Sequence, residues 1–475
     1  MKRAGLTLIF LLFSLGLSSC VNSVEISSEE GVNSVKMSSK EGVNSVEMSY
    51  EEVGMVKILS NVDNEYKRLK DINAKSVNEI LLNFDINTYG VVVKEALDGY
   101  IAASMTNSTS EDQMLTPIIQ KLNEDGKIIW EREYNYPVTN GQVTSMCNFT
   151  DGSFIFLVKI NSYFSDYHEN SFIIKCDKDG KEIWKKELSD FTEDMLKYMF
   201  VNSEGDIFLV GETFNNIGIS DIVISKLNAH GDFIKKSSFG GSDFETIYTA
   251  SYNNELGIII SGISQSSDFE DIKRHHFWFV GCIDEELNLK WIFPAEEKEI
   301  FLSEQLLVDK ENIYVQGYFL AEKDKSNVGF LLKLDKNGER VWSENIFTEM
   351  FSFGRAMEVL ENGNIIISAG IKNKGSLVIL NDSGKEIKRL DNLDYVANKI
   401  VSTFDGGFIV TAERNIKSVE QPVFISSIWY DTECVAIKYK SDYHIEWRKT
   451  YDKYKNEKGL DFVLPLRNGK IVLEK

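Results

Sequence analysis

The chain has 475 residues, with 52 Lys and Arg against 73 Asp and Glu, which gives a formal net charge of −21. Its 43% apolar residues allow a substantial core, and its length allows two or three ordinary domains or one large repetitive one. The acidity argues against a nucleic-acid partner and an anionic membrane surface, because phosphates and acidic lipids attract Lys and Arg.

The first 19 residues have the features of a lipoprotein signal peptide. Lys2 and Arg3 precede an apolar run, Leu6 to Leu17, that is too short for a membrane-spanning helix. The run ends in Leu17-Ser-Ser-Cys20, which resembles the bacterial lipobox. This resemblance implies that the mature chain begins at Cys20 and carries acyl chains such as palmitate there; the alternative is a plain secretory signal. Each buried methylene contributes about 0.8 kcal/mol, so we expect a membrane-attached, extracytoplasmic protein of the cell envelope.

Residues 20–54 contain three copies of an 11-residue repeat, beginning at Val21, Val32 and Val43. A period of 11 would suit a helix with a right-handed apolar stripe, but Asn, Ser and Gly are poor helix formers. The composition therefore predicts a flexible tether. As a coil it would hold the following domain roughly 30 Å from the membrane.

A longer repeat runs through residues 55–475. Five tryptophans are separated by 54, 107, 51 and 105 residues, which are one or two periods of about 53: Trp130, Trp184, Trp291, Trp342 and Trp447. Such periods are typical of repeat folds. One unit contains the strand patterns Val143–Phe149, Phe154–Val158, Phe172–Cys176 and a fourth ending at Trp184, with Asp-Gly turns between pairs. Four antiparallel strands per radial repeat predict an all-β fold, the β-propeller.

The repeats also predict the number of blades. Second strands follow eight turns, near Gly99, Gly152, Gly205, Gly257, Asn312, Gly363, Gly406 and Gly469. The second strand that follows Gly469 has no third or fourth strand after it. Near the start of the chain, Gly54–Leu59 and Glu65–Leu69 have the pattern of a third and a fourth strand, with no first or second strand before them. We therefore expect an eight-bladed propeller in which N- and C-terminal strands share one blade and close the ring. Seven blades remain the alternative if residues 55–69 belong to the tether.

Two segments resemble known propeller families. Lys333 to Trp342 (KLDKNGERVW) resembles the tryptophan-docking repeat of pyrroloquinoline-quinone-type propellers, although its turn is one residue shorter. The resemblance implies that each outer-strand Trp packs between blades. Phe239 to Tyr248 is similar to another bacterial propeller repeat with a Gly-Gly-Ser connection. Both resemblances consist of structural positions, and a fold does not by itself imply a function.

Motifs for catalysis or metal binding are weak. The cysteines after Cys20 form no C-x-x-C motif and are expected to be buried free thiols: Cys147, Cys176, Cys282 and Cys434. His275 and His276, beside Glu270 and Asp271, could imitate a metal site, but a loop before a buried strand explains them equally well. The sequence therefore predicts no catalytic residue, metal or cofactor.

Loop lengths indicate a functional face. Connections between second and third strands and between blades vary, and in a propeller both sets lie on the same face, where recognition is usually placed. Aromatic residues in these loops could stack on sugars or anchor a partner: Tyr163, Phe164, Tyr167, Phe269, Trp429 and Tyr430. We therefore expect a non-enzymatic scaffold that binds a protein or polysaccharide through this face. One alternative resembles the propeller lipoprotein of the outer-membrane β-barrel assembly machinery. The other is an enzyme, either a quinoprotein dehydrogenase or a polysaccharide-degrading propeller.

Overall fold

The structure, a computed structural model, divides into two compact units, residues 1–72 and 73–475. It describes residues 21–29, 32–39, 46–49, 79–82, 92–96, 98–107, 114–139, 141–160, 171–188, 194–214, 219–269, 272, 277–294, 301–320, 327–352, 356–371, 374–415, 432–452, 462–466 and 468–474. The signal peptide, Cys20 and the expected strands Gly54–Leu59 and Glu65–Leu69 lie outside these residues.

The tandem repeat of the first unit forms a small antiparallel sheet with one strand per copy: β1 (Val21–Glu29), β2 (Val32–Ser39) and β3 (Val46–Ser49). The register places Lys36 opposite both Glu25 and Glu47. The role of residues 20–54 as a flexible tether, which the composition predicts, stays a prediction.

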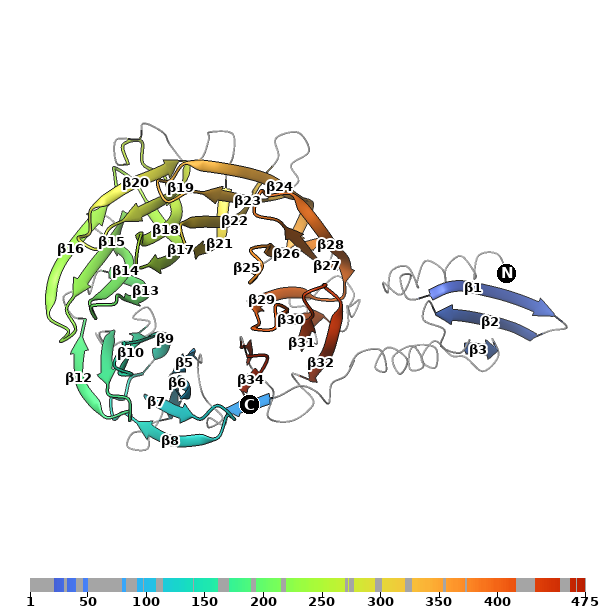
Figure 1. The fold of residues 1–475 in the computed structure, drawn as a ribbon, viewed down its shortest axis with the longest axis horizontal. Coiled ribbons are helices and arrows are strands. Elements are labelled where there is room, and N and C mark those ends of the chain that lie inside the picture. Colours follow the sequence, from blue (N-terminus) through green and yellow to red (C-terminus); the bar gives the residue numbers. More distant parts are fainter. Residues whose placement is uncertain are drawn as a thin grey trace, which may run out of the picture. The chain divides into compact units, whose positions relative to one another are not determined.

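The second unit is a β-propeller, as Figure 1 shows. Blades 1 to 4 are four-stranded and antiparallel. They comprise β5 (Val92–Ala96), β6 (Gly99–Asn107), β7 (Leu115–Leu122) and β8 (Ile128–Glu133); β9 (Gly141–Asn148), β10 (Phe154–Ile160), β11 (Phe172–Cys176) and β12 (Glu182–Glu187); β13 (Asp194–Val201), β14 (Ile207–Phe214), β15 (Ser220–Leu227) and β16 (Phe233–Phe239); and β17 (Glu245–Asn253), β18 (Gly257–Ser264), β19 (Phe277–Ile283) and β20 (Leu289–Pro294).

Blades 5 to 7 repeat this order. They comprise β21 (Phe301–Asp309), β22 (Asn312–Leu320), β23 (Asn327–Leu334) and β24 (Arg340–Ser352); β25 (Met357–Val359), β26 (Ile365–Ile371), β27 (Lys374–Leu380) and β28 (Glu386–Leu393); and β29 (Val396–Ser402), β30 (Phe408–Asn415), β31 (Thr432–Tyr439) and β32 (Ile445–Asp452). The end of β24 also pairs with β26, which joins blades 5 and 6. The first strand of each blade lies innermost in the ring and the fourth outermost (Figure 1).

The expectation of eight four-stranded blades is wrong, and the seven-bladed alternative agrees with the structure. The remaining strands form a three-stranded closing sheet of β33 (Phe462–Pro465), β34 (Ile471–Glu474) and β4 (Glu79–Leu82), in which β4 runs parallel to β34. Strands from the two ends of the second unit therefore lie in one sheet, as expected. The N-terminal strand in that sheet is β4. A short N-terminal strand in parallel orientation gives no hairpin turn that a sequence pattern could reveal.

The closing sheet contacts both of its neighbours. On the blade 7 side, the Tyr451 hydroxyl donates to the Glu79 carboxylate at 2.7 Å, and Ile471 is fully buried in a cluster with Trp447. On the blade 1 side, Asn468 hydrogen-bonds Tyr100. The ring therefore depends on strands from both ends of the second unit.

The core lies between the blades. Ile155 and Leu157 of β10 pack against Met199 and Leu209 of blade 3, while Phe156, on the other face of the same strand, packs toward blade 1. Because both faces of a blade are covered, second and third strands are apolar throughout rather than alternating. This is why they were easy to recognise in the sequence.

Four of the five tryptophans of the repeat dock on glycines. Trp291 lies over Gly338 of the next blade, where an added Cβ would come within 2.4 Å of the ring, and the indole N–H donates to the Lys336 carbonyl at 3.0 Å. Gly338 has φ +79°, a conformation that glycine adopts without steric strain. Three further pairs are alike: Trp130 on Gly180, Trp184 on Gly231 and Trp342 on Gly384.

Where the tryptophan is missing, the glycine is missing too. Lys235 and Lys388 occupy the tryptophan position in blades 3 and 6. The positive-φ residues of the turns that follow in the next blades are Leu287 and Tyr443. The residue at the tryptophan position of each of these outer strands therefore corresponds to the residue type at the positive-φ position of the turn in the next blade.

Candidate functional site

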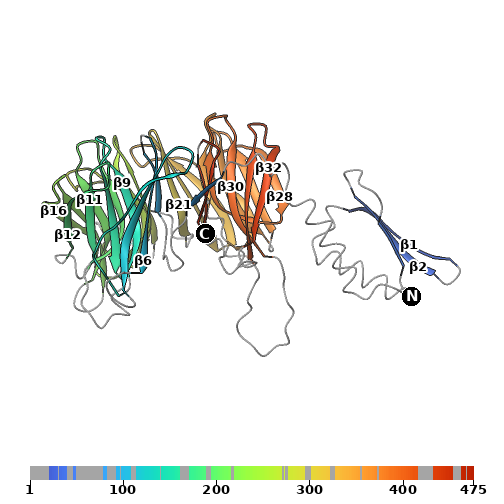
Figure 2. The same cartoon turned by 90° about the horizontal axis from the view of Figure 1, so that it is seen from below.

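The two ends of the ring differ in their connections. At one end, every turn between third and fourth strands is short; Asp177, for example, accepts hydrogen bonds through Oδ1 from the backbone N–H groups of Asp179 and Lys181. At the other end, β26 and β27 are nearly contiguous, whereas β18 and β19 are separated by residues 265–276, and β30 and β31 by residues 416–431. Figure 2 shows the ring from the side. The end with variable connections is called the loop-rich face below.

The candidate binding aromatics divide into two groups. Phe269 is 1% exposed and packs between Phe277 and Phe279, with its ring centroid 5.0 Å from that of Phe279. The expectation that it binds a partner is wrong, because it closes the core beneath the connection rather than facing solvent. The other five lie outside the described residues: Tyr163, Phe164, Tyr167, Trp429 and Tyr430.

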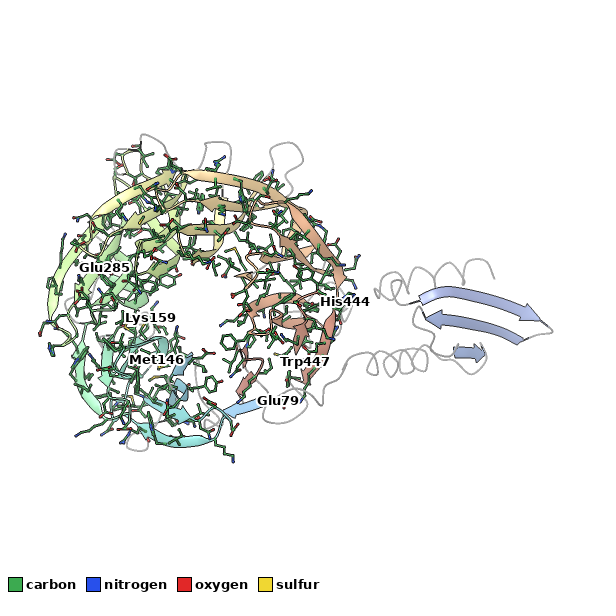
Figure 3. All side chains as sticks on the ribbon, in the orientation of Figure 1. Glu79, Met146, Lys159, Glu285, His444 and Trp447 are labelled. Carbon is green, nitrogen blue, oxygen red and sulfur yellow. The ribbon has the colours of Figure 1, made fainter. Side chains whose placement is uncertain are left out.

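The inner wall of the ring carries lysines that sequence reasoning missed. Lys94 of β5 and Lys399 of β29 are exposed although they lie midway along innermost strands. Lys159, half-buried at the end of β10, lies near the inner margin (Figure 3). Within the described part of the chain, none of the three makes an ion pair.

Both other ammonium groups and carboxylates act on these lysines. Although solvent reaches the Lys399 side chain, desolvation by the surrounding ring lowers its pKa; the charge of Lys94 lowers this pKa further, and Glu358 opposes the shift. Burial likewise lowers the pKa of Lys159, where the charge of Lys197 adds to the shift and Glu212 opposes it.

Glu212 organises the wall next to Lys159. This carboxylate is 3% exposed, and its Oε1 accepts hydrogen bonds from Lys197 Nζ at 2.6 Å and from the Ile247 N–H at 2.7 Å. Lys197 Nζ also donates to the Ile247 carbonyl at 2.9 Å. Lys197 and Glu212 therefore neutralise each other.

Two aromatic rings lie exposed on the same side of the ring. Tyr248 of β17 is 37% exposed, and Phe244, just before that strand, is 39% exposed. The Tyr198 hydroxyl donates to the Tyr248 carbonyl at 2.8 Å, which fixes the backbone beneath the ring. Burial raises the pKa of the Tyr248 hydroxyl, and the nearby Glu212 charge raises it further.

The repeat alignment does not single out Lys159. When the second strands are aligned on the residue that pairs with the end of the third strand, the same place is held in the other blades by Met105, Glu212, Ile263, Tyr318, Gly370 and Glu413. The position is therefore charged in three of the seven blades. The sequence does not show whether such a charge is paired, because its partners come from a neighbouring blade.

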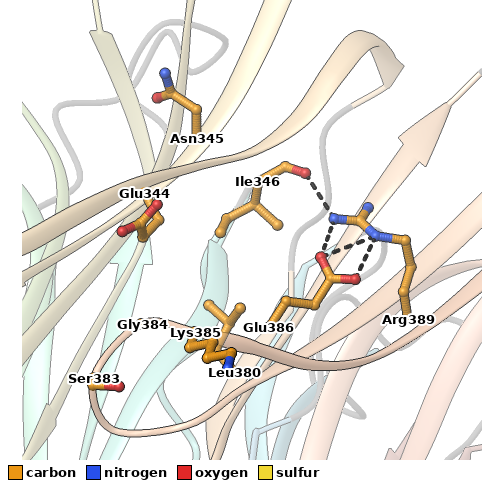
Figure 4. Close-up of a pocket in the computed structure, with 9 residues that line it drawn as sticks. All are labelled: Glu344, Asn345, Ile346, Leu380, Ser383, Gly384, Lys385, Glu386 and Arg389. Carbon is orange, nitrogen blue, oxygen red and sulfur yellow. Dashed lines mark hydrogen bonds and ion pairs between the residues drawn. The ribbon is translucent and has the colours of Figure 1, made fainter.

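The outer side of the ring has a groove of about 360 Å³ between β24 and β28. Its most basic residue, Arg389, is already held by the Glu386 carboxylate at 2.6 Å and by the Ile346 carbonyl at 3.0 Å (Figure 4). Glu386 therefore already neutralises the charge of Arg389, so this groove offers an anionic ligand little net positive charge.

The remaining candidate chemistry is structural. Cys147, Cys176, Cys282 and Cys434 are free thiols, as expected, and burial raises the pKa of Cys147 to about 11. Among the described residues, no three His, Cys, Asp or Glu side chains are grouped so as to hold a metal ion. Glu270, Asp271, His275 and His276 lie outside that part of the chain. None of its described segments forms a helix of the length and apolar character needed to cross a bilayer.

No protein-family profile and no curated protein matches the chain. Among solved structures it is similar to a eukaryotic initiation factor (9% identity over 92% of this chain and 89% of that one, TM-score 0.43) and to puromycin hydrolase (14% over 85% and 59%, TM-score 0.43). A third is the β-propeller domain of the trilobed protease from Pyrococcus furiosus (13% over 72% and 95%, TM-score 0.39). The chain spans 59% of puromycin hydrolase. At these identities the likenesses concern the fold alone, and the assignment to the β-propellers comes from the strand order of this chain.

Proposed function

We propose that the protein is a membrane-anchored, non-enzymatic lipoprotein whose propeller is a rigid scaffold that binds a protein or polysaccharide through its loop-rich face. The observation that carries the proposal is the contrast between the two ends of the ring. Short turns of uniform geometry repeat at one end, while the connections at the other vary from two residues to sixteen. Variable loops on a constant scaffold are the usual arrangement for recognition.

The anchor is part of the same proposal. Lys2, Arg3, the apolar run Leu6 to Leu17 and Cys20 follow the order of a lipoprotein signal peptide. Acylated Cys20 would attach the protein to a membrane of the cell envelope, with the tandem repeat between the anchor and the propeller. Treating cells with a lipoprotein signal-peptidase inhibitor should leave the precursor uncleaved, and Cys20→Ser should release the protein from membranes.

A binding role suits the buried carboxylates. Glu212 is neutralised by Lys197. Glu245, fully buried, accepts hydrogen bonds from Ser264 Oγ at 2.7 Å and Ser266 Oγ at 2.6 Å and holds the Gly-Gly-Ser connection through the Gly241 N–H at 3.1 Å. These groups maintain the architecture, which favours recognition over acid–base chemistry.

A thermal-shift screen tests this function. The full chain with Cys20→Ser would be heated with neutral and acidic glycans, peptidoglycan fragments, and pyrroloquinoline quinone with calcium. A ligand at about 100 times its Kd should add roughly 2.7 kcal/mol of stability. Stabilisation by a glycan that stays intact supports the scaffold. Stabilisation by quinone with calcium, or turnover of a glycan, contradicts a non-enzymatic role, and a flat screen leaves a protein as the partner.

A further inference from the structure

A β-bulge recurs at the same place in the innermost strands of five blades. In each of these strands the third or fourth residue has no partner in the second strand: Thr144, Lys197, Tyr248, Glu304 and Asn398. The innermost strands begin at the loop-rich face, so the bulges lie close to that face. Bulges are frequent beside functional sites, where they redirect a side chain.

The bulge releases two consecutive side chains from the contacts between blades. In β13, Leu196 and Met199 are buried, whereas Lys197 and Tyr198 between them are half-buried. In β17, the bulge residue Tyr248 is 37% exposed. A regular strand would instead turn every second side chain back toward the same neighbouring blade. The bulges therefore leave side chains of the innermost strands accessible to solvent.

Blades 3 and 4 are joined directly at their bulges. The Tyr198 hydroxyl donates to the Tyr248 carbonyl at 2.8 Å, and Lys197 Nζ donates to the Ile247 carbonyl at 2.9 Å. Figure 1 shows β13 and β17 next to each other at the inner margin of the ring. An added peptide strand would need backbone acceptors of these edge strands to be free. Because the two carbonyls are occupied, the junction favours recognition by side chains.

The ion pair at this junction supplies a polar donor without an excess charge. Lys197 Nζ lies 2.6 Å from the Glu212 carboxylate. Among the described residues, its contacts with Glu212 and the Ile247 carbonyl use two of its three N–H donors. The third can donate to a ligand hydroxyl, and a charged donor makes a stronger hydrogen bond than a neutral one.

We propose that the bulges of β13 and β17 form a subsite for a neutral oligosaccharide, in which the Tyr248 ring stacks on a pyranose and Lys197 donates to a sugar hydroxyl. The inference rests on the proposed function and names the class of ligand. A pyranose has apolar C–H groups that pack on an aromatic face. Because Lys197 contacts the backbone immediately before Tyr248, one short oligosaccharide can reach both.

Charge favours a neutral glycan over an acidic one. The net charge of −21 repels an anionic ligand from the protein as a whole. Lys197 attracts such a ligand little, because Glu212 already neutralises it.

Isothermal titration calorimetry of the full chain with Cys20→Ser tests the subsite. The probes are neutral hexasaccharides of glucose, mannose, galactose or N-acetylglucosamine, of which we expect at least one to bind. Tyr248→Ala should weaken its binding by about 10-fold through the loss of stacking, whereas Tyr248→Phe keeps the ring and should retain the affinity. The matched control is Phe233→Ala, which removes a 52% exposed ring from the outermost strand β16 and should change nothing.

A paired variant tests the second contact. Lys197→Met combined with Glu212→Gln removes both charges together, so that no buried carboxylate is left without its cation. We expect this variant to bind the hexasaccharide several-fold more weakly than the native pair, since a charge-assisted hydrogen bond is lost. Unchanged affinity would exclude Lys197 from the subsite.

The outcomes separate this subsite from the scaffold function. Failure of every hexasaccharide to bind, or equal losses in Tyr248→Ala and Phe233→Ala, overturns the subsite. If an acidic glycan, a peptidoglycan fragment or a protein binds instead, the scaffold function survives without it. If a hexasaccharide binds as expected but is cleaved, the subsite stands and the non-enzymatic function fails.

Discussion

At the scale of single residues, the match between tryptophan and glycine decides how neighbouring blades meet. Trp291 lies where only a residue without a Cβ leaves room, and the φ of +79° at Gly338 strains a residue that carries a Cβ. The sequence revealed the tryptophan period, and the resemblance to docking repeats implied contact between blades. It did not reveal that Leu287 and Tyr443 replace glycine because the preceding blade lacks the tryptophan.

Gly338→Ala should lower the free energy of unfolding by about 2–4 kcal/mol, since a strained backbone and an overpacked contact each contribute about 1–3 kcal/mol. Urea denaturation measures this. The control is Lys310→Gly, at an exposed position with φ +53° and no tryptophan above it. That change should leave stability equal or slightly higher; a loss similar to that of Gly338→Ala would show that docking is not the cause.

A buried lysine in blade 7 makes stability depend on pH. Burial alone would raise the pKa of Asp405, but hydrogen bonds from Lys438, Thr403 and the Gly407 N–H outweigh it and hold the pKa at about 2. A depressed carboxyl pKa stabilises the fold above the unfolded value of 3.8, and this stability is lost as the pH falls through about 2. Between pH 4 and pH 2, the free energy of unfolding should therefore fall more steeply with decreasing pH in the native chain than in Asp405→Asn. Equal slopes in the two proteins would contradict this.

At the scale of elements, a strand could be predicted from the sequence where all the strands that it pairs with belong to the same repeat. Every second strand followed the turn expected of it, because apolar runs and Asp-Gly turns are local signals. The closing sheet was not predictable, since β4 pairs with β34 at the far end of the chain and in parallel. Lys94 and Lys399 were missed for a related reason. Whether a charge is paired depends on which blades meet.

At the scale of the whole molecule, the ring depends on its closure. Ile471 of β34 is fully buried against blade 7, whereas Ile183 on the outer strand β12 is 53% exposed. Ile471→Ala should therefore destabilise the propeller by about 2–4 kcal/mol, and Ile183→Ala by less than about 0.5 kcal/mol. Thermal unfolding of both variants compares them directly. Equal shifts in Tm would mean that the closing sheet contributes little to the ring.

The central claim is that recognition takes place at the loop-rich face of the propeller. Hydrogen exchange of the chain with Cys20→Ser, with and without a saturating amount of a ligand found in the thermal-shift screen, tests it most directly. We expect slower exchange where second strands end and first strands begin, for example at the end of β10 and the beginning of β17. Protection confined to the short turns at the opposite end, such as residues 177–181, or no change anywhere, would contradict it.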